Sequence, residues 1–210
     1  MEIVHPAIQT YAEKYTSEEN GLLKEVAEIT RHHPESHMMS GHLQGKVLEM
    51  ISCMIQPRRI LEIGTFTGYS TLCLAKGLTD DGKLHTIELR KQDAEMAAGF
   101  FKKSEFAGKI IQHTGEAARI IPSLNEIWDL VFIDADKPGY IDYFNLVFPH
   151  LRKNGFILAD NIFFHGEVLK DAKGKNAKGI SEFNEMIRKR NDIDKAVLTL
   201  RDGLYIIRKL

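Results

Sequence analysis

From Arg59 onward, short apolar runs alternate with amphipathic stretches, and this alternation constrains the fold more than any other feature of the 210-residue chain. Strands separated by helices predict an α/β fold, a mostly parallel sheet with helices on both faces. The expected strands are Ile60–Ile63, Lys83–Ile87, Ile110–Gln112, Leu130–Ile133, Phe156–Ala159, Ala196–Leu200 and Leu204–Ile207. The expected helices between them are Tyr69–Leu78, Lys91–Lys103, Glu116–Ile121, Tyr140–Leu151 and Ala177–Arg190.

The last two expected strands are joined by only three residues, 201–203. So short a loop permits a hairpin but no parallel crossover, so the final strand should be antiparallel. The first 56 residues show helical spacing instead, as in Leu43, Val47 and Met50. We therefore expect a single domain over residues 1–210, with a helical cap (1–56) and a sheet core (57–210).

Composition and charge exclude several classes of protein. The formal net charge is −1, so the chain has no overall basic field that would attract nucleic acid or an anionic membrane. No apolar run approaches the ~20 residues that span a bilayer, and the N-terminus lacks the apolar core of a signal peptide. The two cysteines, Cys53 and Cys73, lack metal-ligand spacing. We expect a soluble, cytoplasmic protein without a membrane partner.

Gly64 and Gly68 lie where the first expected strand turns into a helix. Glycines allow a positive φ and a close approach of the backbone to a ligand. Their spacing matches neither the dinucleotide nor the phosphate-loop pattern, so a pyrophosphate is not indicated. Glu88 closes the second expected strand about 20 residues later, where a carboxylate accepts hydrogen bonds from ribose hydroxyls. The pattern predicts a nucleoside ligand such as S-adenosylmethionine; the alternative is a tight turn and a solvated glutamate.

Oxygen-bearing side chains follow two of the expected strands. Asp134 ends the fourth strand, and Asp160 and Asn161 end the fifth. The carboxyl ends of parallel strands meet above the crevice where ligands bind. A set of oxygens without His or Cys suits a hard cation, Mg²⁺ or else Mn²⁺ or Ca²⁺, rather than structural zinc. Either aspartate alone could be a helix cap, but two adjacent strand ends favour a metal site.

Lys137 lies three positions after Asp134 and is expected in the same crevice. A free lysine has a pKa near ~10.4, too high for an efficient base at neutral pH. A neighbouring cation and partial burial would both lower that pKa toward the range of a general base. The alternative is a surface lysine or a salt bridge with Asp136.

These motifs, in this order and spacing, resemble those of the metal-dependent catechol and caffeoyl-CoA O-methyltransferases, most closely the small bacterial catechol O-methyltransferases. The resemblance covers nearly the whole chain, and its segments are Leu61–Ser70, Ile120–Pro122, Phe132–Lys137, Ala159–Asn161 and Asp202–Leu204. It implies the Rossmann-like class I methyltransferase fold, a seven-stranded, mostly parallel sheet with an antiparallel last strand and an N-terminal helical cap.

The resemblance also implies a reaction and the residues that perform it. A homodimer would methylate one hydroxyl of a catechol-type aromatic diol, with Lys137 as the general base and Asp134, Asp160 and Asn161 as the metal ligands. The implied S-adenosylmethionine site consists of Ser40, Glu62, Gly64, Phe66, Ser70, Glu88, Ala117 and Asp134.

Two departures from the family pattern concern the substrate. The mammalian catechol enzymes have a tryptophan where this chain has Asp136, and an acid near the sixth strand where this chain has Ala196. Both leave the cofactor and the metal untouched but leave substrate identity and regioselectivity open. Phe163, Phe164 and His165 are expected at the substrate entrance, unless they form an ordinary loop.

The main alternative is a tRNA wobble 5-hydroxyuridine O-methyltransferase, because some bacterial relatives of this fold modify that nucleoside. Those relatives carry a dense arginine run in a late insertion, whereas this chain has the scattered lysines Lys170, Lys173, Lys175 and Lys178 and a net negative charge. An NAD-dependent oxidoreductase is disfavoured by the glycine spacing and the oxygen cluster. A nucleoside-binding module without chemistry would leave Lys137 without a role.

Overall fold

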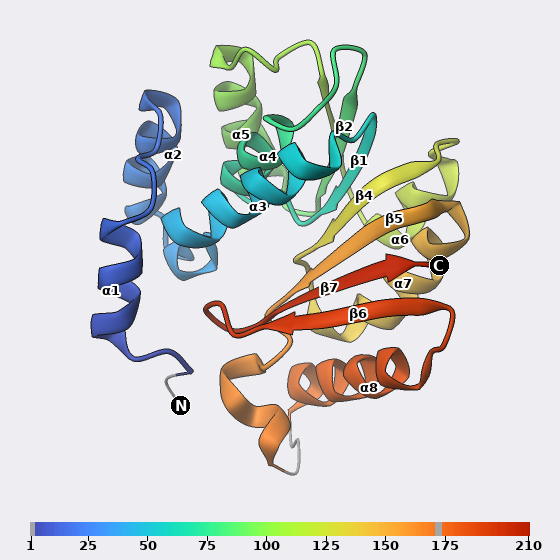
Figure 1. The fold of residues 1–210 in the computed structure, drawn as a ribbon. Helices are drawn as coiled ribbons and strands as arrows, with labels where there is room; N and C mark the ends of the chain where they lie inside the picture. The colour runs from blue at the N-terminus through green and yellow to red at the C-terminus, as the bar shows by residue number, and fades with distance from the viewer. Residues whose placement is uncertain (1–2, 171–173) are drawn as a thin grey trace.

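A sheet of seven strands runs through the centre of the computed structural model, which describes residues 3–170 and 174–210 (Figure 1). The strands lie in the order β3-β2-β1-β4-β5-β7-β6. Their bounds are β1 Arg59–Ile63, β2 Lys83–Glu88, β3 Ile110–Thr114, β4 Trp128–Ile133, β5 Leu151–Asp160, β6 Ile193–Leu198 and β7 Leu204–Lys209.

The sheet is parallel except for its last strand, as predicted. β7 runs antiparallel to both β5 and β6, and the remaining pairs are parallel. The strand order reverses between β1 and β4, where Ile63 pairs with Ile133, and Ile133 pairs in turn with Ala159 of β5. This register brings the residues that follow β1, β4 and β5 to one edge of the sheet, the position at which open α/β sheets bind ligands.

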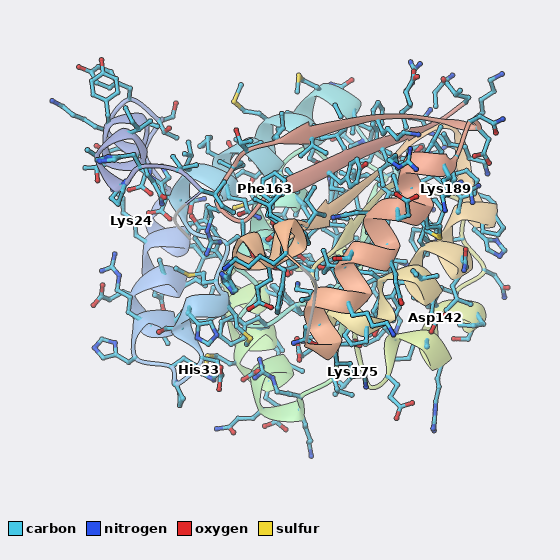
Figure 2. All side chains as sticks on the ribbon, turned by 90° about the horizontal axis from the view of Figure 1, so that it is seen from below. Lys24, His33, Asp142, Phe163, Lys175 and Lys189 are labelled. Atoms are coloured by element: carbon cyan, nitrogen blue, oxygen red, sulfur yellow. The ribbon has the colours of Figure 1, made fainter. Side chains whose placement is uncertain are left out.

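Helices cover both faces of the sheet. Helices α6, α7 and α8 pack on one face, and α2 to α5 on the other (Figure 1). Figure 2 shows α8 as it runs from Lys175 to Lys189. The bounds are α1 Pro6–Lys14, α2 Gly21–Arg31, α3 His42–Ile55, α4 Tyr69–Ala75, α5 Lys91–Lys103, α6 Ala117–Ile120, α7 Tyr140–Val147 and α8 Lys175–Lys189. Among the described residues, no helix has the length and apolar character needed to cross a membrane.

Alternate residues of the central strands face two different hydrophobic cores. In β4, Val131 and Ile133 pack in the core beneath α7 and α8, whereas Leu130 and Phe132 pack in the core beneath α2 to α5. Successive side chains of a strand point to opposite faces, so a strand covered on both sides needs an apolar residue at nearly every position. This double burial is why the central strands appear as continuous apolar runs in the sequence.

The predicted bounds were wrong where polar residues extend a strand or a proline ends a helix. β5 begins at Leu151 instead of Phe156, since Arg152 to Asn154 continue the strand although they are exposed. Helix α7 ends at Val147 instead of Leu151, because Pro149 lies in the following turn and cannot donate a helical hydrogen bond. β6 ends at Leu198, which pairs with Leu204 of β7. The loop that joins the two strands is therefore longer than the three residues expected.

A histidine pair on β2 and β3 makes stability depend on pH. His85 Nδ1 lies 3.1 Å from His113 Nε2. Burial lowers the pKa of both rings, and the charge of His113 lowers that of His85 further. The unfolded imidazoles therefore bind protons more readily, so stability present above the ordinary histidine pKa of ~6.5 is lost as the pH falls below it.

We expect the free energy of unfolding of the unmodified protein, measured by urea denaturation relative to that of the His113→Gln variant, to fall between pH 7.5 and pH 5.5. The comparison is needed because Glu62, whose pKa is raised to about 7, titrates over the same range in both proteins and has the opposite effect. Each histidine contributes at most the ~1.4 kcal/mol per pH unit that corresponds to one whole proton. The His113→Gln variant, which cannot be protonated, should lose less stability over this range. Equal losses in the two proteins would show that the pair is not responsible.

Candidate active site

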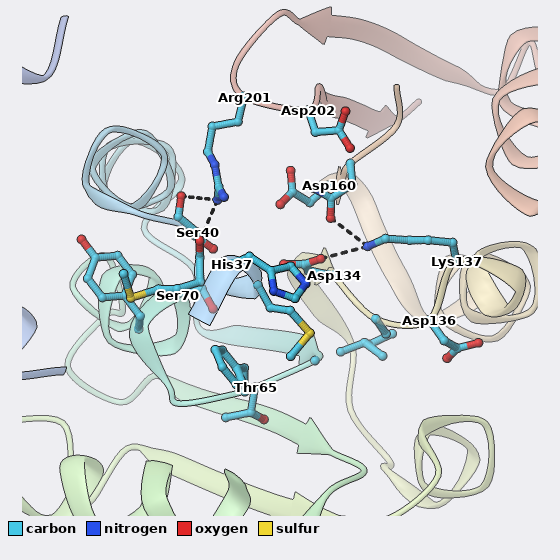
Figure 3. Close-up of a pocket in the computed structure, with 18 of the residues that line it drawn as sticks. His37, Ser40, Thr65, Ser70, Asp134, Asp136, Lys137, Asp160, Arg201 and Asp202 are labelled. Carbon is cyan, nitrogen blue, oxygen red and sulfur yellow. Dashed lines mark hydrogen bonds and ion pairs between the residues drawn. The ribbon is translucent and has the colours of Figure 1, made fainter. Parts of the chain in front are cut away.

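A cavity of about 1310 Å³ opens at the edge of the sheet where β1, β4 and β5 end (Figure 3). Its wall combines the loops after β1, β2, β4 and β5 with α1, the segment before α3 and the β6–β7 hairpin. The structure therefore brings together, around one space, residues from most of the length of the chain. The predicted site residues in the wall are Ser40, Gly64, Phe66, Ser70, Glu88, Ala117, Asp134, Lys137, Asp160 and Asn161.

Gly64 is required by a close approach between two loops. It has a φ of +102°, and a Cβ atom built on it would lie 2.0 Å from the backbone oxygen of Asp134. Its own N–H donates to the carbonyl of Ile87 at 3.0 Å, and the Asp134 N–H donates to the carbonyl of Ile63 at 2.9 Å. The glycine loop is thus pressed against the end of β4, with no room for a side chain between them.

Glu88 holds the loop after β1 against the loop after β2. One carboxylate oxygen accepts the N–H of Phe66 at 2.7 Å, and the other accepts the N–H of Arg90 at 2.9 Å. The side chain is buried but lines the cavity. Each carboxylate oxygen has a second acceptor position, so Glu88 can still accept hydrogen bonds from ligand hydroxyls.

Glu62 is the one predicted site residue that the structure does not place in the cavity wall. It is fully buried beneath the glycine loop, where it accepts hydrogen bonds from the hydroxyls of Ser70, Thr71 and Thr86. Burial raises the pKa of Glu62 to about 7, although these hydroxyl groups oppose the rise. Glu62 therefore holds Ser70, which lines the cavity, and its own predicted contact with the cofactor stays a prediction.

The three predicted metal ligands lie together, and a cation site fits their chemistry. Asp160 is 1% exposed, and its Oδ1 has no hydrogen-bond partner among the described residues. Lys137 Nζ donates to Asp134 Oδ1 at 3.0 Å and to Asn161 Oδ1 at 2.8 Å (Figure 3). Asp134 and Asn161 thus already contact one positive charge, and in the part of the chain that the structure describes Asp160 keeps one buried oxygen unpaired.

The donor set consists of two carboxylates and an amide. Within residues 3–170 and 174–210, no cluster of three or more His, Cys, Asp and Glu side chains is arranged to hold a metal. Burial, and then the charge of Asp134, raise the pKa of Asp160 above its ordinary value. This arrangement suits a hard cation, which prefers oxygen ligands and would stabilise the buried charge.

The oxygens around Lys137 raise the pKa of its ammonium group, and the fall expected beside a bound cation stays a prediction. Burial by itself would lower that pKa, but the Tyr140 hydroxyl and the Asp134 carboxylate hold it above its ordinary value. Lys137 Nζ donates to the Tyr140 hydroxyl at 2.8 Å, so the ammonium has three oxygen partners. A second cation bound among these oxygens would offset their negative charge and lower the pKa of Lys137.

The residues that depart from the family pattern occupy different places. Asp136 lines the cavity and accepts a hydrogen bond from Tyr143, whereas Ala196 is exposed on β6 and is not part of the wall.

Phe164 and His165 line the cavity, but Phe163 lies against Gly203 instead. Of the four scattered lysines, Lys170, Lys175 and Lys178 are exposed, and Lys173 lies outside the described residues.

Two residues near the site were missed by the sequence analysis. Gln44 of α3 is 1% exposed, and its Nε2 donates to Asp160 Oδ2 at 2.7 Å. Arg201 of the β6–β7 hairpin lines the cavity, and its Nη1 donates to the backbone carbonyls of Met39 and Ser40. Gln44 had a detectable signal, because it is a polar residue beside the apolar stripe of its helix. Arg201 had none, because a loop arginine is ordinarily solvated.

Comparison with known proteins agrees with this geometry. A family model described as O-methyltransferase matches residues 13–210. A catechol O-methyltransferase of Niastella koreensis is 34% identical over 75% of this chain and 73% of its own length. Caffeoyl-CoA O-methyltransferase 1 of Eucalyptus globulus is 29% identical over 90% of this chain and 81% of its own.

Among solved structures, the O-methyltransferase TomG of Streptomyces achromogenes, determined in complex with S-adenosylmethionine, superposes with a TM-score of 0.89. It is 31% identical in sequence, and the match covers 97% of this chain and 96% of TomG. The shared sheet, the position of the cavity and a family model that spans almost the whole chain lead to one conclusion. The chain belongs to the O-methyltransferase family.

Proposed function

We propose that the protein transfers the methyl group of S-adenosylmethionine to one hydroxyl of a catechol-type aromatic diol, with the help of a divalent cation. The cation would be Mg²⁺, or else Mn²⁺ or Ca²⁺. The observation that carries the proposal is the convergence of Asp134, Asp160, Asn161 and Lys137 in the cavity that also contains the Gly64 loop. The similarity to a catechol O-methyltransferase and to the S-adenosylmethionine complex of TomG supports it.

Several residues of the cavity wall would hold S-adenosylmethionine. Glu88 would accept hydrogen bonds from the ribose hydroxyls, as a carboxylate does at this position of a doubly wound sheet. Gly64 leaves the backbone bare at the end of β1, so the cofactor can approach closely. Ser40, Phe66, Ser70, Ala117 and Asp134 would form the rest of this site in the cavity wall, with Glu62 buried beneath them.

The oxygen cluster would prepare the acceptor hydroxyl. Asp134, Asp160 and Asn161 would hold the cation, and a bound cation lowers the pKa of a hydroxyl that coordinates it. In its neutral form, Lys137 Nζ would take the proton of that hydroxyl. The deprotonated oxygen would then attack the methyl carbon, whose bond to the sulfonium sulfur would break and release S-adenosylhomocysteine. Because opposite charges are neutralised in this step, a site that excludes water favours it over bulk solution.

The proposal includes a cytoplasmic homodimer, as the resemblance implies. Helix α1 has no buried residue. Its Ile8 and Tyr11 are each 62% exposed, and Tyr15, which directly follows the helix, is 68% exposed. Neighbouring apolar side chains at one surface are a common feature of protein–protein contacts, and they support an interface of this kind.

The test offers the enzyme two classes of acceptor. The purified protein is incubated with labelled S-adenosylmethionine and Mg²⁺, with and without a chelator, in the presence of protocatechuate, caffeate or bulk tRNA. We expect methyl transfer to the catechols, and we expect the chelator to abolish it. Transfer to tRNA alone would favour the wobble-uridine activity instead, and transfer that persists with chelator would rule out the role of the cation.

A further inference from the structure

We propose that Gln44 is a positioning residue that orients the Asp160 carboxylate for a cation, and that Arg201 orients Gln44. This inference rests on the proposed function, because it assigns a role to residues behind the metal site. Gln44 belongs to the N-terminal helices and Arg201 to the last hairpin, so two distant parts of the chain would support one ligand.

The contact between Gln44 and Asp160 distinguishes the two carboxylate oxygens. Gln44 Nε2 donates to Oδ2 at 2.7 Å, whereas Oδ1 is buried without a hydrogen-bond partner among the described residues. A carboxylate held at one oxygen cannot turn freely about its terminal bond, a torsion that is otherwise broad. The amide therefore fixes the side chain and leaves one oxygen available. A neutral amide also leaves the negative charge of Asp160 intact for the cation.

Arg201 determines which end of the Gln44 amide faces Asp160. Its Nη1 lies 3.4 Å from Gln44 Oε1 and also donates to the carbonyls of Met39, at 2.9 Å, and Ser40 (Figure 3). A guanidinium has only donors, so it requires the amide oxygen on its side and directs the amide nitrogen to the carboxylate. The three groups thus form a chain of hydrogen bonds that runs from Arg201 through Gln44 to Asp160.

A purely structural role for Gln44 would lead to a different change in cation affinity when the residue is replaced. If Gln44 only satisfied its own hydrogen bonds in the interior, its loss would lower stability and leave cation affinity unchanged. If it positions Asp160, its loss would weaken cation binding, since groups that hydrogen-bond to metal ligands contribute about 10–100-fold to affinity. Cation affinity, measured without any turnover, therefore separates the two roles.

The experiment measures binding of Mn²⁺ alone to the full chain by electron paramagnetic resonance. The Gln44→Met variant keeps the length and shape of the side chain but has no donor, and we expect its Kd for Mn²⁺ to rise at least tenfold. Ser52→Ala is the matched control, because Ser52 is a fully buried polar residue on the same helix that donates to the Leu74 carbonyl and does not contact Asp160. Its Kd should stay within twofold of that of the unmodified protein.

Two further variants keep the inference testable if Gln44→Met does not fold. Gln44→Asn retains the amide but withdraws it from Asp160, and Arg201→Lys retains the charge but not the planar fork. We expect each to raise the Kd for Mn²⁺ at least threefold. An unchanged Kd in the folded Gln44 variants would overturn the positioning role and leave the proposed function standing. Failure of the unmodified protein to bind Mn²⁺ would instead count against the metal site itself.

Discussion

Substitution of Lys137 by methionine should lower kcat for a catechol about 10²–10⁴-fold, the usual contribution of a general acid or base. Lys137 Nζ lies within 3.0 Å of oxygens of Asp134 and Asn161, so it is next to the place proposed for the acceptor hydroxyl. Methionine has nearly the same length and cannot take a proton. Affinity for S-adenosylmethionine should change by no more than a few-fold, because the Gly64 loop and Glu88 are unaltered.

Steady-state kinetics at saturating Mg²⁺ and a direct titration of S-adenosylmethionine would measure the two quantities separately. The matched control is Lys178→Met, which removes a lysine whose side chain is 70% exposed and paired with Glu182. This control should keep its turnover. If Lys137→Met retained kcat within threefold, Lys137 could not be the base.

Gly64→Ala should lower the free energy of unfolding by several kcal/mol, the sum of a backbone-strain cost and an overpacking cost. The φ of +102° at this position is essentially restricted to glycine, and another residue held there costs about 1–3 kcal/mol. The added Cβ would also lie 2.0 Å from the Asp134 carbonyl oxygen, a backbone atom that can yield only if β4 shifts. Overpacking of this kind adds about 1–3 kcal/mol. The melting temperature should therefore fall by about 5–20 °C.

Gly99→Ala serves as the control in the same thermal-unfolding measurement. Gly99 lies within α5, and a Cβ atom added there has no neighbour within 4 Å. Alanine has the higher helix propensity, so this variant should be more stable by about 0.5–1 kcal/mol. If the two alanine variants melted at the same temperature, the close approach of Gly64 to Asp134 would not be a constraint on the fold.

Much of the fold could be predicted because its signals are local. The apolar runs from Arg59 onward indicated the strands of the sheet, since a strand buried on both faces has to be apolar along its length. The predicted ends were less accurate at β5 and β6, which include exposed residues. An exposed strand residue needs no apolar side chain, so the apolar pattern of the sequence does not mark such a residue as part of a strand. Backbone hydrogen bonding decides where the strand begins or ends.

The meeting of Asp134, Asp160 and Asn161 could also be predicted, because parallel topology alone brings adjacent strand ends together. The partners of these residues could not. The position of Glu62 beneath the cavity depends on which face of β1 the hydroxyls of Ser70, Thr71 and Thr86 cover. The sequence motif that contains Glu62 does not show whether its side chain lines the cavity or lies beneath it.

By itself, the sequence determined the α/β architecture, the antiparallel last strand and the strand ends that carry the oxygen cluster, because all three follow from periodicity and loop length. Only the tertiary structure decided that Asp160 keeps one oxygen unpaired among the residues that the structure describes. That outcome depends on Gln44, which is 116 positions away, and on Arg201, which is 157 positions from Gln44. Contacts over such separations arise only when the N-terminal helices and the last hairpin pack over the same edge of the sheet.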